Sequence, residues 1–164
     1  VYSLLSLSGI EGAYERAKES YSEAETFDPK NPSIKLLLAR LESQTGNLDG
    51  SRNLALEAIN LKRNYTEAFL VITQIDIARG DVKSAIDGAE ASIILEPNNA
   101  ARHYQLGVLY LSDENPELAV RALERSVEID GNYANALYYL AVGYQGLGEV
   151  EKAKEVLELS LIHI

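Results

Sequence analysis

Glu42 and Asp76 are two carboxylates that lie 34 positions apart, and a pair of carboxylates could support acid–base chemistry. Paired carboxylates transfer protons when their surroundings separate their two pKa values, so that one acts as acid and the other as base. Neither a histidine nor another acid–base partner recurs beside them. We therefore expect structural carboxylates at helix junctions, either solvated or paired with arginine. Arg40 and Arg79 are close enough in the sequence to be the ion-pair partners of these carboxylates.

The other chemistry-bearing residues form no catalytic or metal-binding pattern. The two histidines, His103 and His163, are far apart in the sequence and have no matching nucleophile, so each is expected at the surface or at a junction. The chain has no cysteine and no glycine-rich phosphate loop. The sequence therefore predicts no catalytic residue, no metal site and no cofactor, and we do not expect an enzyme.

The composition excludes several classes of partner. The 164 residues include 15 basic and 25 acidic side chains, for a formal net charge of -10, and 46% of them are hydrophobic. A nucleic-acid-binding surface needs a basic stripe, so this acidity argues against nucleic acid. Polar residues interrupt every apolar stretch well before the roughly 18 residues of a membrane span, so direct membrane insertion is not expected.

The ends of the sequence favour a piece of a longer chain. It begins at Val1 in an apolar run rather than at a methionine, and it stops at Ile164 inside another apolar periodic stretch. We expect a soluble domain, and the compartment stays open between the cytoplasm and the bacterial periplasm or envelope.

A period of 34 residues organises the whole sequence. Glycine recurs at positions 12, 46, 80 and 148, and Glu114 stands where the series expects one more. Each glycine is expected to end a first helix, because it reaches the left-handed conformation without a Cβ penalty. Asn47, Asp81 and Asn115 then supply acceptors for the free amides that begin a second helix.

Two series of small residues follow the same period, and both are expected where paired helices cross, since small side chains let two backbones approach closely. The first series is Ala17, Ser51, Ala85, Ala119 and Ala153, and the second is Ala24, Ala58, Ser92, Ser126 and Ser160. The sequence therefore predicts an all-α array of helix pairs.

The chain resembles the tetratricopeptide repeat (TPR) family, whose pattern places Leu-Gly and Tyr in the first helix and small residues in the second. The repeat with Leu106-Gly107, Tyr110, Ala119 and Leu123 matches best. The resemblance implies a right-handed α–α superhelix, a TPR solenoid of about five helix-turn-helix repeats in one domain, 1–164. The repeats would be 1–31, 32–65, 66–99, 100–133 and 134–164.

The resemblance also implies a concave groove lined by the first helices, and with it a non-catalytic scaffold that binds a peptide or helix of another protein. The groove residues expected from it are Tyr2, Leu36, Arg40, Leu70, Gln74, Ile77, Tyr104, Val108, Leu111, Tyr138 and Val142. Exposed tyrosine is favoured at binding hot spots. Tyrosine is also common here in the family, so ordinary packing remains an alternative.

Two further alternatives stay open. The array could assemble with itself through its ends, where Leu157, Leu161 and Ile164 would seek cover, giving a homo-oligomer. The tracts at 31–42, 64–68 and 95–99 are also similar to repeat tracts of bacterial O-antigen polymerase-like envelope proteins, which would make the domain an appendage for glycan assembly. Positions where some relatives hold a carboxylate-binding clamp carry unsuitable residues here, so no such clamp is expected.

Overall fold

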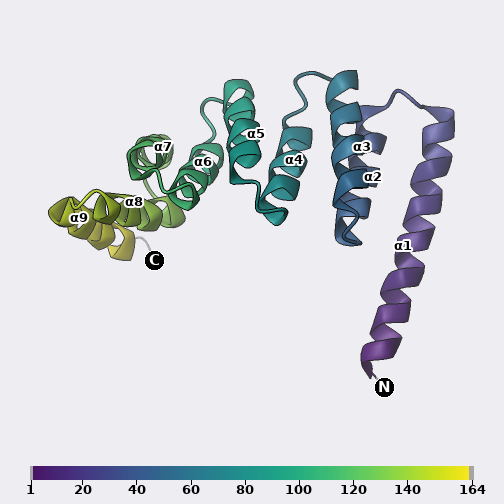
Figure 1. Cartoon of the computed structure of the whole chain (residues 1–164), viewed down its shortest axis with the longest axis horizontal. Coiled ribbons are helices and arrows are strands. Elements are labelled where there is room, and N and C mark those ends of the chain that lie inside the picture. Colours follow the sequence, from purple (N-terminus) through teal and green to yellow (C-terminus); the bar gives the residue numbers. More distant parts are fainter. Residues whose placement is uncertain (1, 163–164) are drawn as a thin grey trace. The chain divides into compact units, whose positions relative to one another are not determined.

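The computed structural model describes the backbone of residues 2–162 and the side chains of residues 12–159. Within this part of the chain it contains nine α-helices and no strand (Figure 1), which confirms the all-α prediction. The helices are α1 (Tyr2–Phe27), α2 (Pro32–Gln44), α3 (Leu48–Leu61), α4 (Thr66–Ala78), α5 (Val82–Leu95), α6 (Ala100–Ser112), α7 (Pro116–Ile129), α8 (Ala134–Gly146) and α9 (Val150–Ile162).

After α1, the helices follow one another as four pairs, and the turn inside each pair contains a residue with positive φ. Gly46, Gly80 and Gly148 have φ angles of 81°, 73° and 77°. Glycine adopts this left-handed conformation without the clash that a Cβ causes. Glu114 occupies the remaining turn with φ of 56°, so the turn geometry is kept even where the glycine is replaced.

The predicted N-terminal caps of the second helices are confirmed. In Asn47, Asp81 and Asn115 the side-chain oxygen accepts a hydrogen bond from the backbone amide three residues later. The donor–acceptor distances are 3.1, 3.1 and 3.3 Å. Each bond satisfies an amide that would otherwise lack a partner inside its helix, and so defines where α3, α5 and α7 begin.

The predicted small residues are buried in the second helices of the pairs. In the first series Ser51, Ala85 and Ala119 are 0% exposed and Ala153 is 7% exposed, and in the second Ala58, Ser92 and Ser126 are at most 1% exposed.

The crossing of α6 over α7 shows how tight this packing is. A Cβ added to Gly107 would lie 2.4 Å from Cγ of Leu123, well inside van der Waals contact. The large side chain of α7 therefore fits only because α6 has none at the facing position.

The first repeat departs from the expected pattern, because α1 is one helix of 26 residues that runs through Gly12 without a turn. The prediction that this glycine ends a helix is wrong. In the α2–α3, α4–α5 and α6–α7 turns the next residue is Asn or Asp, which caps the second helix, whereas Gly12 is followed by Ala13. Alanine offers no side-chain acceptor, so nothing here favours the start of a new helix.

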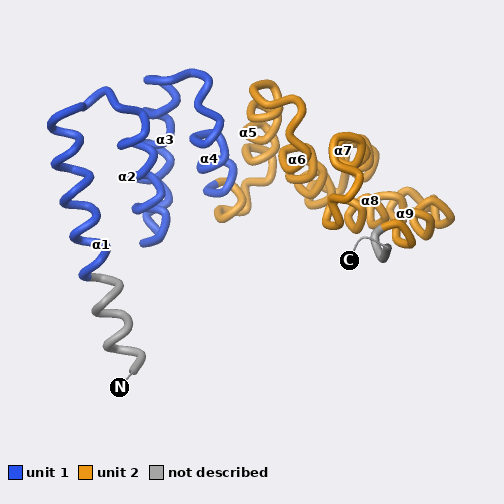
Figure 2. Tube along the Cα trace, turned by 180° about the vertical axis from the view of Figure 1, so that it is seen from behind, with its two compact units in different colours: residues 1–75 blue, residues 76–164 orange. Residues whose placement is uncertain are grey.

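The chain divides into two compact units, residues 1–75 and residues 76–164 (Figure 2). Unit 1 is built on a core in which Leu36 and Ala39 of α2, Ala55 of α3, and Val71 and Ile75 of α4 are buried together. Unit 2 contains two such cores. The buried residues of the first are Ala85, Ile86, Ala89, Leu106, Leu109 and Ala122. Those of the second are Ala119, Val120, Leu123, Ala136, Leu140, Ala141, Tyr144 and Ala153.

Two equivalent hydrogen bonds join neighbouring repeats in unit 2. The Tyr110 hydroxyl of α6 donates to the Glu90 carboxylate of α5, and the Tyr144 hydroxyl of α8 donates to Glu124 of α7 at 2.6 Å. Burial, reinforced by these carboxylates, raises the pKa of both Tyr110 and Tyr144 to about 12. The neutral hydroxyl is therefore the form that the fold stabilises.

Replacing Glu114 by glycine should stabilise the protein. A non-glycine residue in the left-handed region destabilises the folded state by roughly 1–2 kcal/mol. Glycine removes this strain, but its greater freedom in the unfolded chain offsets part of the gain in stability. We expect Glu114→Gly to raise the free energy of unfolding by about 0.5–1 kcal/mol in urea titrations. Glu114→Ala is the matched control, because it keeps the Cβ, and an equal gain from it would contradict the explanation.

The tyrosine–glutamate bonds should give the protein a late alkaline transition. The folded pKa of Tyr144 lies above the ordinary value of 10.0, so its contribution to stability is present below about pH 10 and is lost as the pH rises towards 12. Absorbance of tyrosinate at 295 nm should show a late phase that shrinks in Tyr144→Phe. Tyr138→Phe, a control without a carboxylate partner, should leave that phase intact.

Candidate protein-interaction surfaces

The first helices of unit 1 form a shallow pocket between α2 and α4. It has a volume of about 320 Å³ and is lined by Arg40, Ser43 and Gln44 of α2 and by Leu70, Val71 and Gln74 of α4. The structure therefore brings together Arg40, Leu70 and Gln74, three of the residues expected in the groove. An apolar floor flanked by amide, hydroxyl and guanidinium groups suits a peptide, whose backbone needs hydrogen-bond partners.

Leu36 does not belong to this surface. It is 3% exposed and lies in the same buried cluster as Ala68 and Ile72 of α4. The side chain at the equivalent position of the next repeat, Leu70, is partly exposed and lines the pocket. The expectation that Leu36 faces a groove is thus corrected, because packing against α4 uses its whole side chain.

Unit 2 carries a cluster of four tyrosines on and beside α6 and α8. Tyr104 packs edge-on against Tyr133 and Tyr139, with ring centroids 5.2 and 5.7 Å apart, and Tyr138 packs edge-on against Tyr139 at 5.3 Å. Tyr138 remains 53% exposed. Edge-to-face contacts hold the rings in place, so the exposed face is rigid before any partner binds. Burial raises the pKa of Tyr104.

The other predicted groove residues differ in exposure. Ile77 is 46% exposed and Val142 is 37% exposed, while Val108 is partly exposed. Leu111 packs partly into the core of unit 2. The side chain of Tyr2 lies outside the described residues.

Glu42 is a buried, fully bonded carboxylate and not a solvated one. It is 8% exposed, its Oε1 lies 2.9 Å from Nζ of Lys18, and its Oε2 accepts a 2.6 Å hydrogen bond from Asn47. Tyr14 adds a hydrogen bond of 3.3 Å. Hydrogen bonding to Lys18, and then to Asn47, lowers the pKa of Glu42. The expected pairing with Arg40 is wrong, since a lysine of α1 supplies the positive charge.

Asp76, the second carboxylate of that series, is only 2% exposed and so is not solvated, while its pairing with Arg79 stays a prediction. His103 places Nε2 2.9 Å from the carbonyl oxygen of Pro97, at the turn between α5 and α6, as a junction residue would. His163 lies outside the described residues. Among the residues that the structure describes, no group of three or more His, Asp or Glu side chains is arranged to hold a metal ion.

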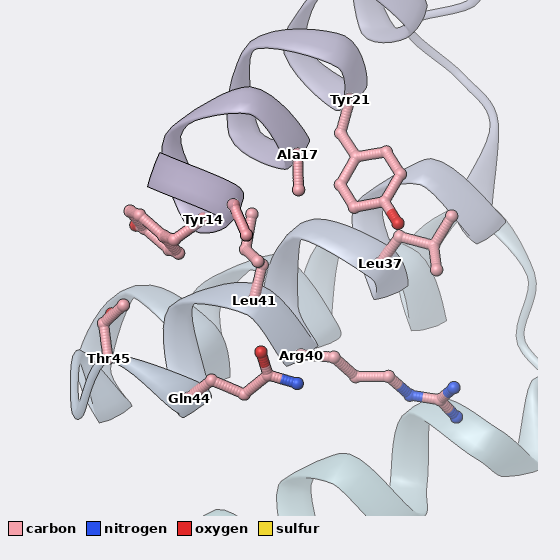
Figure 3. A pocket seen from close by; sticks show the side chains of 9 residues that line it. Tyr14, Ala17, Tyr21, Leu37, Arg40, Leu41, Gln44 and Thr45 are labelled. Atoms are coloured by element: carbon pink, nitrogen blue, oxygen red, sulfur yellow. The ribbon is translucent and has the colours of Figure 1, made fainter. Parts of the chain in front are cut away.

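Sequence reasoning missed a second pocket, between α1 and α2. It has a volume of about 470 Å³, and its walls are Ala13, Tyr14, Ala17 and Tyr21 of α1 and Leu37, Arg40, Leu41, Gln44 and Thr45 at α2 (Figure 3). One sequence signal could have indicated it: Gly12 is followed by Ala13, which cannot cap a second helix, so α1 continues as one helix beside α2.

Of the helices that the structure describes, none is both long and apolar enough to cross a bilayer.

Comparison with known proteins identifies the repeat. Two family models, both described as tetratricopeptide repeat, match residues 10–75 and residues 100–133. The human PEX5-related protein is 33% identical over 82 residues, which are 50% of this chain and 13% of that protein. The uncharacterized protein ycf37 of Porphyra purpurea is 27% identical over 68% of this chain and 65% of its own length. The chain thus spans a small part of the first relative and about two thirds of the second.

Solved structures share the fold. MamA superposes with a TM-score of 0.83 at 21% identity, covering 94% of this chain and 90% of MamA. YrrB, described as a TPR protein with an unusual peptide-binding site, gives 0.77 at 20% identity over 87% of this chain and 74% of its own. PilF of Pseudomonas aeruginosa gives 0.79 at 17% identity over 99% and 75%. The likeness to O-antigen polymerase-like proteins stays a prediction. With its helix pairs, left-handed turns and buried small residues, this chain belongs to the tetratricopeptide repeat family.

Proposed function

We propose that the protein is a non-catalytic scaffold that binds a peptide or helix of another protein on the exposed sides of its first helices. The observation that carries this proposal is the tyrosine cluster of α6 and α8, in which Tyr138 is 53% exposed although its ring is packed against Tyr139. A rigid aromatic side chain left half in water has a large apolar area available for a partner at little entropic cost.

The pocket of unit 1 supports the same function with different chemistry. Leu70 and Val71 provide apolar contact, while Gln44, Gln74 and Arg40 can hydrogen-bond a bound backbone or carboxylate. The peptide-binding site named for the structural relative YrrB is in keeping with this use of the fold. The net charge of -10 favours partners of mixed or basic character elsewhere on the surface.

Self-assembly is the alternative with a structural observation behind it. On α9, Leu157 is 39% exposed and Leu159 is 46% exposed. Exposed leucines on a terminal helix are the kind of surface that a further repeat or a second copy covers. Attachment to an envelope glycan-assembly protein would be compatible with either function.

A charged substitution on a first helix of either unit should weaken partner binding. A partner is first captured from the source lysate and purified, and its affinity is then measured by calorimetry. We expect Leu70→Glu or Tyr138→Glu to weaken binding by about thirtyfold, equivalent to the loss of about 2 kcal/mol at a hot spot.

The matched controls place the same charge on second helices. Leu56 of α3 is 37% exposed and Ile94 of α5 is 80% exposed, so Leu56→Glu and Ile94→Glu change similar apolar surface elsewhere. These variants should bind normally. Binding that survives Leu70→Glu and Tyr138→Glu but fails in the controls would assign recognition to the second helices and refute the proposal.

A further inference from the structure

One face of α1 is uncovered, whereas the equivalent faces of α3, α5 and α7 are buried. By the 34-residue period, Ala17 corresponds to Ser51, Ala85, Ala119 and Ala153; Tyr21 to Ala55, Ala89 and Leu123; and Ala24 to Ala58, Ser92 and Ser126. The equivalent residues of α3, α5 and α7 are at most 1% exposed, whereas Ala17, Tyr21 and Ala24 are all partly exposed. In α9 the equivalent of Tyr21 is Leu157, which is 39% exposed. The second helix of the first repeat is thus present without a first helix folded against it.

The pocket between α1 and α2 lies at this uncovered face. Figure 3 shows the Tyr21 ring directed towards Leu37 of α2, with Ala17 and Leu41 further along the same two helices. Its volume of about 470 Å³ is lined, among the residues that the structure describes, by α1, α2 and the turn that follows α2. A surface of alanine, leucine and tyrosine in this position is the surface that elsewhere in the chain receives a helix.

The other repeats show what kind of helix covers such a face. In α2 and α6 the covering helix carries an aliphatic residue, a small residue, a variable residue and a second aliphatic residue, in the segments 38–41 and 106–109. Leu38 and Leu106 are at most 8% exposed, and the small residue after Leu106, Gly107, faces Leu123 of α7. Tyr21 is bulky, so the repeat that resembles this pocket most is the one in which Gly107 faces Leu123.

The chain's own first residues do not meet this requirement. In the 34-residue register Leu5 stands at the position held by Ala39, Thr73 and Gly107. A leucine opposite Tyr21 would overfill a crossing that elsewhere excludes even one added Cβ. A second copy of the chain is also poorly suited, because its own helices of this pattern are already buried in their repeats.

The charge of the pocket indicates which side chains a bound helix should carry. Among its nine lining residues Arg40 alone is charged, and its side chain is exposed. A carboxylate on the incoming helix would be favoured over a lysine by this guanidinium.

We propose that the α1–α2 pocket binds an amphipathic helix of another protein, which carries the pattern aliphatic–Gly/Ala–x–aliphatic and an acidic side chain and completes the first repeat. The site adjoins the pocket between α2 and α4 and shares Arg40 and Gln44 with it, but its apolar residues Ala17, Tyr21 and Leu37 line this pocket alone. A helical partner buries Ala17, Tyr21 and Leu37 in the way that α6 buries the facing residues of α7.

The probe is a fluorescein-labelled synthetic peptide with the sequence of residues 99–113, which contains the Leu-Gly-Val-Leu pattern and ends in aspartate. Fluorescence anisotropy with the full chain should show saturable binding at micromolar concentration. A peptide with leucine in place of the glycine should bind at least tenfold more weakly, because its side chain meets Tyr21. Equal binding of the two peptides, or no binding of either, would overturn the proposal.

Variants of the protein locate the binding. Ala17→Glu and Arg40→Glu, each verified as helical by circular dichroism, should weaken binding at least tenfold. Ser22→Glu, an exposed α1 position outside the pocket, should not change it, and neither should Leu70→Glu, which tests the other surface. Binding lost in Leu70→Glu and kept in Ala17→Glu would overturn this proposal while leaving the proposed function intact.

Two further results would assign the pocket to a different occupant and so overturn the proposal. If the peptide binds only a chain lacking residues 1–11, those residues fill the pocket. If the full chain associates with itself in sedimentation velocity runs, and Ala17→Glu abolishes that association, a second copy fills it.

Discussion

The close crossing of paired helices is the constraint on which the rest of the structure depends. Gly107 has no room for a Cβ beside Leu123, and Ala85 and Ala119 are fully buried. In two crossings the small residue is a serine whose hydroxyl donates to the facing helix: Ser51 to the Ala39 carbonyl at 2.6 Å, and Ser126 to the Ala100 carbonyl at 2.8 Å. Dispersion contacts at this distance, together with these hydroxyl hydrogen bonds, hold α2 against α3 and α6 against α7.

Rigid pairs determine what remains for a partner. The first helix of a pair packs its small and aliphatic residues against the second helix. The side chains that remain exposed to a partner are therefore those that lie between successive first helices. In unit 1 these form the pocket with Arg40 and Leu70, and in unit 2 the cluster that includes Tyr104 and Tyr138. The hydrogen bond from Tyr144 to Glu124 joins one pair to the next, so this surface does not need to order itself on binding.

The first repeat shows what happens when the local signals for a pair are missing. Gly12 is followed by Ala13, which cannot cap a second helix, and the helix continues as α1. The face of α1 with Ala17, Tyr21 and Ala24 then corresponds to the buried face of a second helix, but no first helix that the structure describes packs against it. The charged cluster of Lys18, Glu42 and Asn47 still ties α1 to the α2–α3 turn, so the uncovered face has a defined place against α2.

The sequence by itself determined the period, the capping residues and the buried small series, because each depends on local geometry within one pair. Even Glu114 could be placed in a left-handed turn from its register alone. Only the tertiary structure decided that Leu36 packs in a core while Leu70 faces a pocket, and that Lys18, rather than Arg40, pairs with Glu42. These outcomes depend on which helix lies next to a position, and equivalent positions in a repeat have different neighbours. The sequence also could not decide that α1 stays straight, since a glycine permits a turn but does not require one.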